Sequence, residues 1–113
     1  MTTSITYNAG VWITSAATIY SAGSTGITRS TNGGINWVTQ ATISGDLLTI
    51  CFTDSLNGIA AGRNSLMLRT SNGGINWNPV TVSGMYDIYM VRYLNSANVF
   101  ACGQGGAIGK STN

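Results

Sequence analysis

Few side chains in this 113-residue chain have the types and spacing that catalysis needs. The carboxylates belong to Asp46, Asp54 and Asp87 only, and the sequence contains no histidine and no glutamate. Without histidine, neither a Ser-His-Asp triad nor a Cys-His pair can form. Asp46 and Asp87 hold equivalent positions in two repeated segments, which favours hydrogen-bond acceptors in turns over a pair of catalytic carboxylates. We therefore expect a protein that is not an enzyme.

The sequence also offers no motif for a cofactor. Three aspartates far apart in the sequence form no metal-binding motif. The segment Gly103-Gln104-Gly105-Gly106 joins two expected strands and opens no helix, as a phosphate-binding loop would. Cys51 and Cys102 lie in apolar strand sequences of different repeats. We expect no metal and no cofactor, and we interpret both cysteines as buried free thiols rather than as a disulfide.

The composition excludes several kinds of partner. Only 7% of the residues are charged, against about 25% in an average soluble domain. The net charge of +2 is too small for the clustered basic face of a nucleic-acid-binding protein. No run of about 18 apolar residues predicts a membrane span, and Met1-Thr2-Thr3-Ser4 lacks the features of a signal peptide. Solubility that rests on Ser, Thr and Asn favours an extracellular or virion-associated protein over a cytosolic enzyme.

A repeated motif determines the expected architecture. The residues Asn-Gly-Gly-Ile-Asn-Trp occur at Asn32–Trp37 and again at Asn72–Trp77, and Lys110-Ser111-Thr112-Asn113 begins a third copy. A fixed period near forty is typical of a fold that stacks one supersecondary unit several times. We divide the chain, a single domain, into units at 6–45, 46–86 and 87–113, with residues 1–5 as a partial closing strand.

Each unit is expected to form four short strands. In the middle unit these strands are 47–53, 58–62, 65–70 and 75–82, and residues with turn preferences separate them. Four antiparallel strands in about forty residues are typical of a β-propeller blade. We therefore predict an all-β fold made of propeller blades.

Alignment of the units on the repeated motif predicts which positions form the core. These positions are occupied by Trp12, Phe52 and Tyr93, by Ile19, Ile59 and Phe100, and by Ile27, Met67 and Ile108. Tyr20, Tyr86 and Tyr89 lie outside these positions, so we interpret them as freer to make surface contacts.

The repeated motif has a local physical explanation. Asn-Gly-Gly suits a hairpin turn because Asn tolerates and Gly prefers a positive φ angle. The hydroxyl two residues before each Asn and the Asn side chain can hydrogen-bond the turn backbone. The Trp that follows can pack between units. The residues assigned to this structural role are Ser30, Asn32, Gly34, Trp37, Thr70, Asn72, Gly74 and Trp77.

Both copies resemble the Asp-box (BNR) repeat of β-propellers, Ser/Thr-x-Asp-x-Gly-x-x-Trp, with Asn in place of Asp. The preceding basic residue and the upstream Ala22-Gly23 and Ala61-Gly62 are similar to those of photosystem-assembly-factor-like and secreted bacterial propellers. The resemblance implies the fold over nearly the whole chain. It implies little about activity, because Asp-box propellers include sialidases, lectins, sorting receptors and assembly factors. The glutamate of the sialidase site has no counterpart here, so that chemistry is not carried over.

One cation precedes each copy of the motif, at Arg29, Arg69 and Lys110. These residues would form a ring of charge on one face of an assembled disc, or their stems would cover the Trp across the hairpin in cation–π contacts. We favour the second interpretation, because a residue that recurs in every repeat serves the repeat.

Ligand binding is expected where the repeats differ. The connections between second and third strands contain Gly23-Ser24-Thr25, Arg63-Asn64-Ser65 and Gln104-Gly105-Gly106, and residues 83–87 lengthen the connection between two blades. Neutral hydrogen-bonding side chains beside a tyrosine suit a sugar or an uncharged protein surface. The residues selected as the candidate binding site are Arg63, Asn64, Gln104 and Tyr86.

The number of strands predicts self-association. The chain holds about 2.75 blades, whereas propellers close with about four to eight. Two copies related by the common C2 symmetry would give six blades, so we expect a ring completed by oligomerisation, with a homodimer favoured. We predict a non-enzymatic, lectin-like recognition module that binds carbohydrate or a protein surface. The alternative is a propeller fragment or scaffold whose only activity is self-association.

Overall fold

The second repeat forms a complete four-stranded antiparallel sheet. In the computed structural model, which describes residues 8–14, 17–24, 26–43, 45–80, 87–95, 98–103 and 108–111, the strand order of this sheet is β5-β6-β7-β8. Buried apolar side chains dominate its first two strands, as the sequence predicts. The strands are β5 (Leu47–Phe52), β6 (Gly58–Gly62), β7 (Met67–Thr70) and β8 (Asn78–Pro79).

The fourth strand of this sheet is shorter than expected. β8 contains two residues where the sequence predicts a strand at 75–82. Pro79 lacks the N–H group that a further ladder hydrogen bond would need, and such a residue is tolerated only at a sheet edge. The expected third strand at 65–70 is also shortened, because a 3-10 turn, η1 (Arg63–Ser65), occupies its start.

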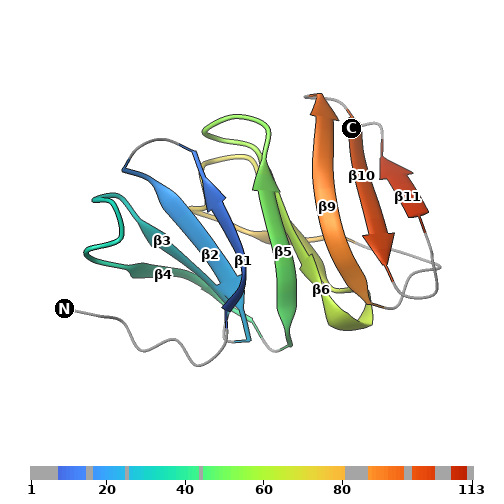
Figure 1. Cartoon of the computed structure of the whole chain (residues 1–113), viewed down its shortest axis with the longest axis horizontal. Helices are drawn as coiled ribbons and strands as arrows, with labels where there is room; N and C mark the ends of the chain where they lie inside the picture. The colour runs from blue at the N-terminus through green and yellow to red at the C-terminus, as the bar shows by residue number, and fades with distance from the viewer. Residues whose placement is uncertain are drawn as a thin grey trace.

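The other repeats form two further antiparallel sheets (Figure 1). The first sheet has the order β1-β2-β3-β4, and the last sheet has the order β11-β10-β9. The strands of the first sheet are β1 (Asn8–Ile13), β2 (Ile19–Gly23), β3 (Gly26–Ser30) and β4 (Val38–Thr42). Those of the last sheet are β9 (Ile88–Asn95), β10 (Asn98–Gly103) and β11 (Ile108–Ser111).

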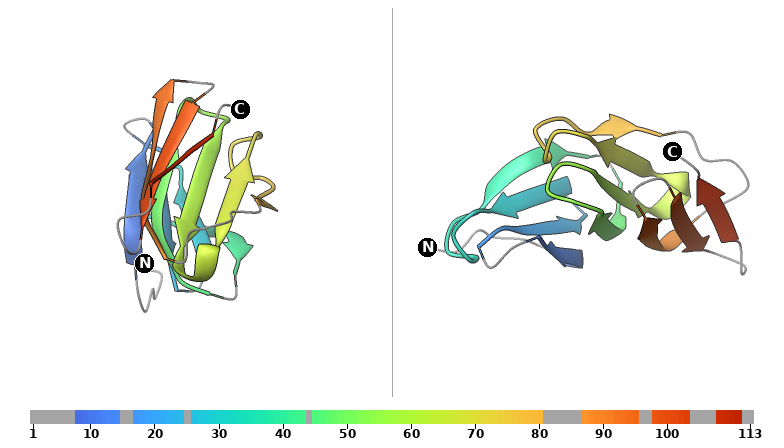
Figure 2. Two further views of the ribbon diagram at one scale, coloured as in Figure 1. Left: turned by 90° about the vertical axis from the view of Figure 1, so that its right-hand side faces the viewer. Right: turned by 90° about the horizontal axis from the view of Figure 1, so that it is seen from above.

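The three sheets are arranged like a fan. β1 packs against β5, and β5 packs against β9, so the first strands of the three sheets lie together while the later strands spread outward (Figure 2, right). The molecule measures 41 × 28 × 20 Å along its principal axes. The predicted all-β fold is therefore confirmed, whereas its completion by a second chain stays a prediction.

Two apolar clusters fill the spaces between the sheets. The first joins sheets one and two through Tyr20, Ala22, Ile27, Leu47, Ile50, Phe52, Ala60 and Leu68. The second joins sheets two and three through Cys51, Ile59, Ala61, Met67, Ile88, Val91, Val99 and Ala101. Trp12 packs against both clusters. The core of the molecule is therefore located between the blades.

The interpretation of Tyr20 as a surface residue is wrong. Its side chain is fully buried, and it lies opposite Trp12 on the neighbouring strand. In the second sheet the corresponding pair is Ile59 opposite Cys51. The register of the first sheet thus places Tyr20 where the second sheet has Ile59, and Trp12 does not share a position with Phe52.

Two residues expected to be buried are exposed. Phe100 and Cys102 alternate along β10 and share one face of the last sheet, and no described strand packs against that face. Cys51 is buried, as predicted, and both thiols are free. Four predictions concern parts of the chain outside the described residues. They are the binding roles of Tyr86 and Gln104, the partial closing strand at residues 1–5 and the core position of the Ile108 side chain.

Candidate functional site at the loops beside Arg63

The repeated motif, or box, forms a hydrogen-bonded hairpin, the box hairpin, between β3 and β4. The Ser30 hydroxyl accepts a hydrogen bond from the backbone N–H of Gly34 (2.8 Å) and donates one to the Asn32 side-chain oxygen (3.0 Å). The same oxygen accepts the backbone N–H of Asn36 at 2.9 Å. Gly33 and Gly34 adopt φ angles of 74° and 95°, which side chains disfavour. These residues serve the turn itself.

The second copy repeats this network between β7 and β8. The Thr70 hydroxyl accepts from Gly74 N–H (2.9 Å), and the Asn72 side chain accepts from Asn76 N–H (3.0 Å). The two copies differ at the indole. Trp37 donates to the carbonyl oxygen of Gly34 at 3.0 Å, whereas Trp77 packs edge-on against Phe52, with ring centroids 5.9 Å apart.

The cations before the boxes contact aromatic side chains other than the expected tryptophans. The Arg29 guanidinium lies 5.6 Å from the centre of the Tyr20 ring, on the neighbouring strand. Arg69 forms a side-chain hydrogen bond with Tyr93 of the last sheet. The predicted stacking on the hairpin Trp is therefore not what the structure shows for Arg29, because Tyr20 is its direct cross-strand neighbour. The side chain of Lys110 lies outside the described residues.

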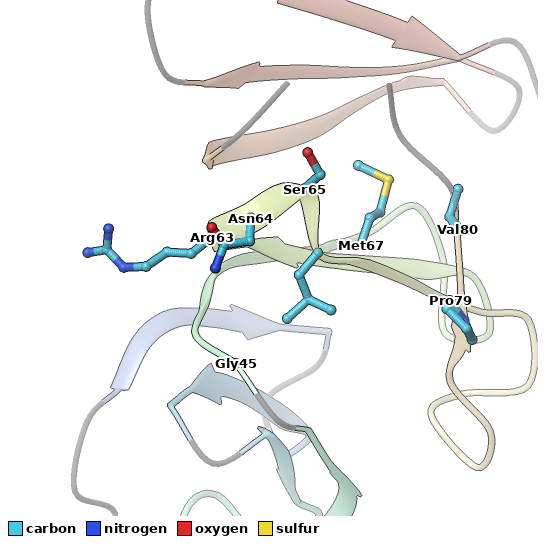
Figure 3. A pocket seen from close by; sticks show the side chains of 8 residues that line it. Gly45, Arg63, Asn64, Ser65, Met67, Pro79 and Val80 are labelled. Atoms are coloured by element: carbon cyan, nitrogen blue, oxygen red, sulfur yellow. The ribbon is translucent and has the colours of Figure 1, made fainter. Parts of the chain in front are cut away.

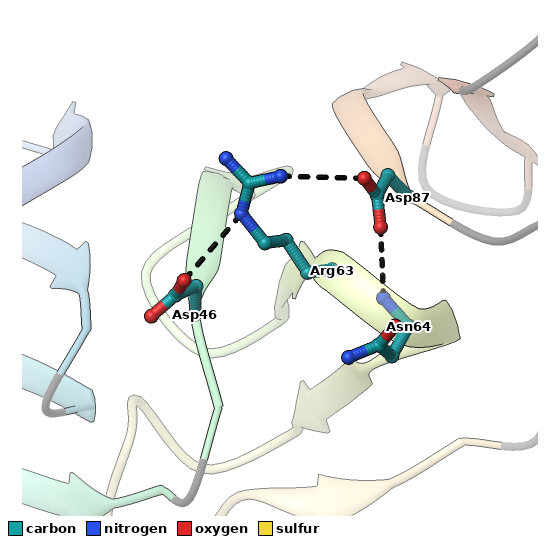
Figure 4. A network of polar contacts seen from close by, with 4 residues as sticks. All are labelled: Asp46, Arg63, Asn64 and Asp87. Carbon is teal, nitrogen blue, oxygen red and sulfur yellow. Dashed lines mark hydrogen bonds and ion pairs between the residues drawn. The ribbon is translucent and has the colours of Figure 1, made fainter.

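Arg63 links two aspartates at the opposite end of the sheets from the box hairpins. Its Nε atom is 3.4 Å from a carboxylate oxygen of Asp46, and its NH1 group is 3.3 Å from a carboxylate oxygen of Asp87 (Figure 4). The second oxygen of Asp87 accepts the backbone N–H of Asn64 at 3.1 Å. The sequence predicts that both aspartates are hydrogen-bond acceptors in turns, and Asp87 accepts a backbone N–H of the η1 turn. Both carboxylates also pair with Arg63, so Asp87 ties the last sheet to the second.

The backbone of this loop is held in an unusual conformation. Asn64 and Ser65 adopt positive φ angles of 58° and 60°, a region that costs a residue with a side chain about 1–2 kcal/mol. Gly62, immediately before the loop, allows a close approach, because a Cβ atom there would lie 1.9 Å from the carbonyl oxygen of Asp46. Arg63 N–H donates to that same carbonyl oxygen at 2.9 Å. The loop is therefore fixed by contacts with the starts of two blades.

A groove of about 310 Å³ lies beside this loop (Figure 3). The side chains of Ser65, Met67 and Val80 are grouped around it, while that of Arg63 extends away toward its aspartate partners. The groove thus combines an apolar wall with a polar rim. Its lining residues are Gly45, Arg63, Asn64, Ser65, Leu66, Met67, Pro79 and Val80.

The structure brings together half of the candidate binding residues. Arg63 and Asn64 adjoin in the η1 loop and line the groove, whereas Tyr86 and Gln104 lie outside the described residues. Sequence reasoning missed Met67, Pro79 and Val80, whose only signal was their apolar character. Within the described part of the chain, no group of three or more Cys, Asp, Glu or His residues is placed to hold a metal ion. The described residues also include no helix long and apolar enough to cross a membrane.

The fold defines a class: it matches part of a β-propeller, with two four-stranded sheets and a third sheet of three described strands. Two solved structures of YCF48 support this class over 95% of the chain. YCF48 bound to D1 peptide superposes with a TM-score of 0.83 at 16% sequence identity, and YCF48 from Cyanidioschyzon merolae with 0.78 at 17%. An ancestral GH74 enzyme superposes over the full chain with a TM-score of 0.81 at 21% identity.

These similarities concern the fold alone. The chain spans 37% of the length of each YCF48 chain and 18% of the GH74 enzyme. No family model and no curated protein sequence matches it. The expected resemblance to propellers of the photosystem-assembly-factor type is confirmed as a structural match.

Proposed function

We propose that this chain is a non-enzymatic recognition module that binds its ligand in the groove beside Arg63 and Asn64. The observation that carries the proposal is the η1 loop, which contains two residues with positive φ and hydrogen-bonds the start of its own blade at Asp46 and the start of the last blade at Asp87. Backbone strain of this kind persists where the surrounding structure enforces it, and it clusters at binding sites. The loop presents the polar rim of a groove whose wall is apolar.

The chemistry of the groove favours an uncharged ligand. The single positive charge of Arg63 is outweighed by the two carboxylates of Asp46 and Asp87 at 3.4 and 3.3 Å, so the cluster offers no net attraction to an anion. Asn64 and Ser65 supply hydrogen-bonding groups, and Met67 and Val80 supply apolar contact. A carbohydrate, or an uncharged segment of a protein surface, combines the same two properties.

The comparisons support binding without selecting the ligand. YCF48, which shares this fold, was solved with a peptide bound, and the ancestral GH74 enzyme shows the same fold in a catalyst. Because one fold serves many functions, the choice between sugar and protein surface rests on the groove itself. The absence of histidine and glutamate from the sequence supports a binding role over a catalytic one.

Binding arrays test this proposal directly. The chain is applied to a glycan array and to an array of uncharged peptides, together with a Val80→Trp variant that fills the groove. A Val38→Trp variant is the matched control, because Val38 is an exposed valine of β4 outside the groove. We expect specific signals that Val80→Trp abolishes and Val38→Trp retains. Two empty arrays, or signals that survive in Val80→Trp, would overturn the proposal.

Self-association is a second candidate function, supported by a separate observation. Large apolar side chains are exposed on the outer faces of the first and last sheets, Val11 and Ile13 on one and Met90 on the other. Exposed apolar faces of this kind mark interaction surfaces. We propose that copies of the chain assemble through these faces, and native mass measurement at several concentrations tests it. A monomer at every concentration would contradict the proposal.

A further inference from the structure

Three Asn-Gly pairs occur in the chain, at 32–33, 57–58 and 72–73. In such a pair the backbone nitrogen of Gly can attack the side-chain carbon Cγ of the preceding Asn, because Gly has no side chain to hinder the approach. The new N–Cγ bond closes a succinimide ring, the Cγ–Nδ2 bond breaks, and ammonia leaves with the proton of the Gly amide. Water then opens the ring at either carbonyl and gives aspartate or isoaspartate. All three pairs share this chemistry, so the fold decides which of them reacts.

The second of these pairs is held within a sheet. Gly58 is buried and pairs with Phe52 of β5 on one side and with Thr70 of β7 on the other. The Asn57 amide donates to both carboxylate oxygens of Asp54, at 3.1 and 3.0 Å. Ring closure would release these hydrogen bonds and distort the backbone at the start of β6, so the sheet protects this pair.

The third pair lies in the second box hairpin, where neighbouring segments anchor it. Gly73 is buried, and its N–H donates to the carbonyl oxygen of Leu56 at 2.9 Å. Its own carbonyl oxygen accepts the Tyr20 hydroxyl at 2.8 Å. A Cβ atom on Gly73 would lie 3.3 Å from the carbonyl oxygen of Ser55, so little space surrounds the attacking residue. Contacts with other segments therefore protect Asn72.

The first pair lies in the same kind of turn but has open surroundings. Asn32 and Gly33 are both exposed, and the box hairpin between β3 and β4 projects away from the other two sheets (Figures 1 and 2). Apart from the adjoining residues, no described atom lies within 4 Å of the Cβ position of Gly33. Gly33 N–H donates to the carbonyl oxygen of Ala17 at 2.9 Å, the length of the corresponding bond of Gly73, so this bond does not distinguish the two hairpins. Access for water and for a closing ring does.

The aspartate product fits the first box hairpin. The Asn32 side-chain oxygen accepts the Ser30 hydroxyl at 3.0 Å and the Asn36 backbone N–H at 2.9 Å, and a carboxylate oxygen accepts the same two donors. The Asn32 amide also donates to the Asn36 side-chain oxygen at 2.9 Å. A half-turn of the exposed Asn36 amide presents its NH2 group to the new carboxylate and replaces that bond. Isoaspartate lengthens the backbone by a carbon atom, so it does not keep the bonds of the turn in register.

We propose that Asn32 is a modification site at which the chain deamidates itself, whereas the fold protects Asn57 and Asn72. The reaction consumes water and releases ammonia, and it needs no other reactant. It replaces a neutral side chain by a carboxylate on the exposed hairpin and so lowers the formal net charge of +2 by one. The aspartate form keeps the hairpin closed, and the isoaspartate form opens it.

Peptide mapping by mass spectrometry tests this proposal. The native chain and a chain denatured in guanidinium chloride are incubated at mildly alkaline pH, which promotes loss of the Gly amide proton. The ratio of the denatured to the native rate measures the protection of each Asn. We expect this ratio to be several times larger at Asn57 and Asn72 than at Asn32. Equal ratios at the three sites, or a native chain in which Asn32 does not react, would overturn the proposal.

A variant of Tyr20 tests the cause of the protection at Asn72. Tyr20→Phe removes the hydroxyl that holds the Gly73 carbonyl, so the native rate at Asn72 is expected to rise several-fold while the rate at Asn32 stays the same. Tyr89→Phe is the matched control, because Tyr89 is exposed. Equal rates at Asn72 in the two variants would contradict the protection assigned to the neighbouring segments.

Two variants at position 32 test the fit of the product. Asn32→Asp keeps the acceptor for Ser30 and Asn36, so its thermal midpoint is expected to stay close to that of the wild type. Asn32→Ala removes the acceptor from both donors and is expected to lower the midpoint. Equal losses in the two variants would show that the hairpin does not accommodate the carboxylate and would contradict the closed aspartate form.

Discussion

The Tyr20 hydroxyl donates a hydrogen bond of 2.8 Å to the carbonyl oxygen of Gly73, 53 residues later in the chain. Gly73 belongs to the box hairpin of the second sheet, so this bond joins the first blade to the turn of the next. The Tyr20 ring also stacks on Phe52 of that sheet. Burial raises the pKa of the Tyr20 hydroxyl, and the nearby Arg29 charge opposes that shift. The hydroxyl therefore stays protonated and able to donate.

Removal of this hydroxyl is expected to weaken the contact between the first two blades. Tyr20→Phe keeps the ring stacking but leaves the Gly73 carbonyl without this donor, which costs about 1–3 kcal/mol for a buried group. The free energy of unfolding is measured by urea denaturation at one fixed protein concentration. Tyr89→Phe is the matched control, because Tyr89 is exposed. Equal losses in the two variants would contradict the role assigned to the Tyr20 hydroxyl.

The strand order and the box turns could be predicted from the sequence because both depend on local chemistry. Asn-Gly-Gly supplies the positive φ angles of the turn wherever it occurs. The environment of Tyr20 could not be predicted in this way. Its burial depends on the connection between β2 and β3, because Tyr20 lies opposite Arg29 as Ile59 lies opposite Arg69, and the segment 20–29 is one residue shorter than the segment 59–69. A shift of one residue moves a side chain to the other face.

The two box tryptophans are expected to contribute unequally to stability. Trp77 packs against the first apolar cluster and edge-on to Phe52, so Trp77→Ala removes a large core contact worth about 3–5 kcal/mol. Trp37 is half-buried and belongs to neither cluster. Trp37→Ala should therefore cost clearly less. Thermal unfolding of both variants at equal concentration checks this order, and a reversed order would show that Trp37 supports an interface absent from the described structure.

The candidate site was predictable only in part. The divergence of Arg63-Asn64-Ser65 from the equivalent loops identified the segment that lines the groove. The sequence did not reveal that Arg63 forms ion pairs with both Asp46 and Asp87, because these residues lie 17 and 24 positions away in the chain. Charge pairing between loops is decided by how the blades pack, and that information is not local.

Loss of the Arg63 charge should cause a small, salt-dependent loss of stability. Arg63→Met leaves the carboxylates of Asp46 and Asp87 without their shared cation. The ion-paired side chains of Arg63 and Asp46 are 47% and 42% exposed, so the cost is about 0–1 kcal/mol. Urea denaturation at low and high salt measures it, with Arg63→Lys as a control that keeps the charge. A loss that is the same at both salt concentrations would contradict an ionic role.

The turn at Asp54 should make the protein less stable in acid. Its carboxylate accepts the backbone N–H groups of Leu56 and Asn57, both at 2.8 Å, and the Asn57 side-chain amide. The hydrogen bond from the Asn57 side-chain amide is the largest of the effects that lower the pKa of Asp54 below 3.8. A lowered pKa means that the stabilisation is present above the unfolded value and is lost as the pH falls through the folded value. We expect the difference in thermal midpoint between wild type and Asp54→Asn to shrink in that acidic range, and a constant difference would contradict this.

The two cysteines are expected to differ sharply in reactivity. Cys102 is exposed and Cys51 is buried, and burial is the main reason that the Cys51 pKa rises from 9.0 to about 11. Because only the thiolate reacts readily, a thiol-specific reagent at pH 8 should modify one cysteine per native chain and two per denatured chain.

The raised pKa of Cys51 also has a consequence for stability. The unfolded thiol ionises first, so the contribution of Cys51 to stability is complete below pH 9 and is lost as the pH rises toward 11. Cys51→Ala should therefore reduce the alkaline sensitivity of unfolding, whereas Cys102→Ala should leave it unchanged. Modification of both thiols in the native protein would contradict the burial of Cys51.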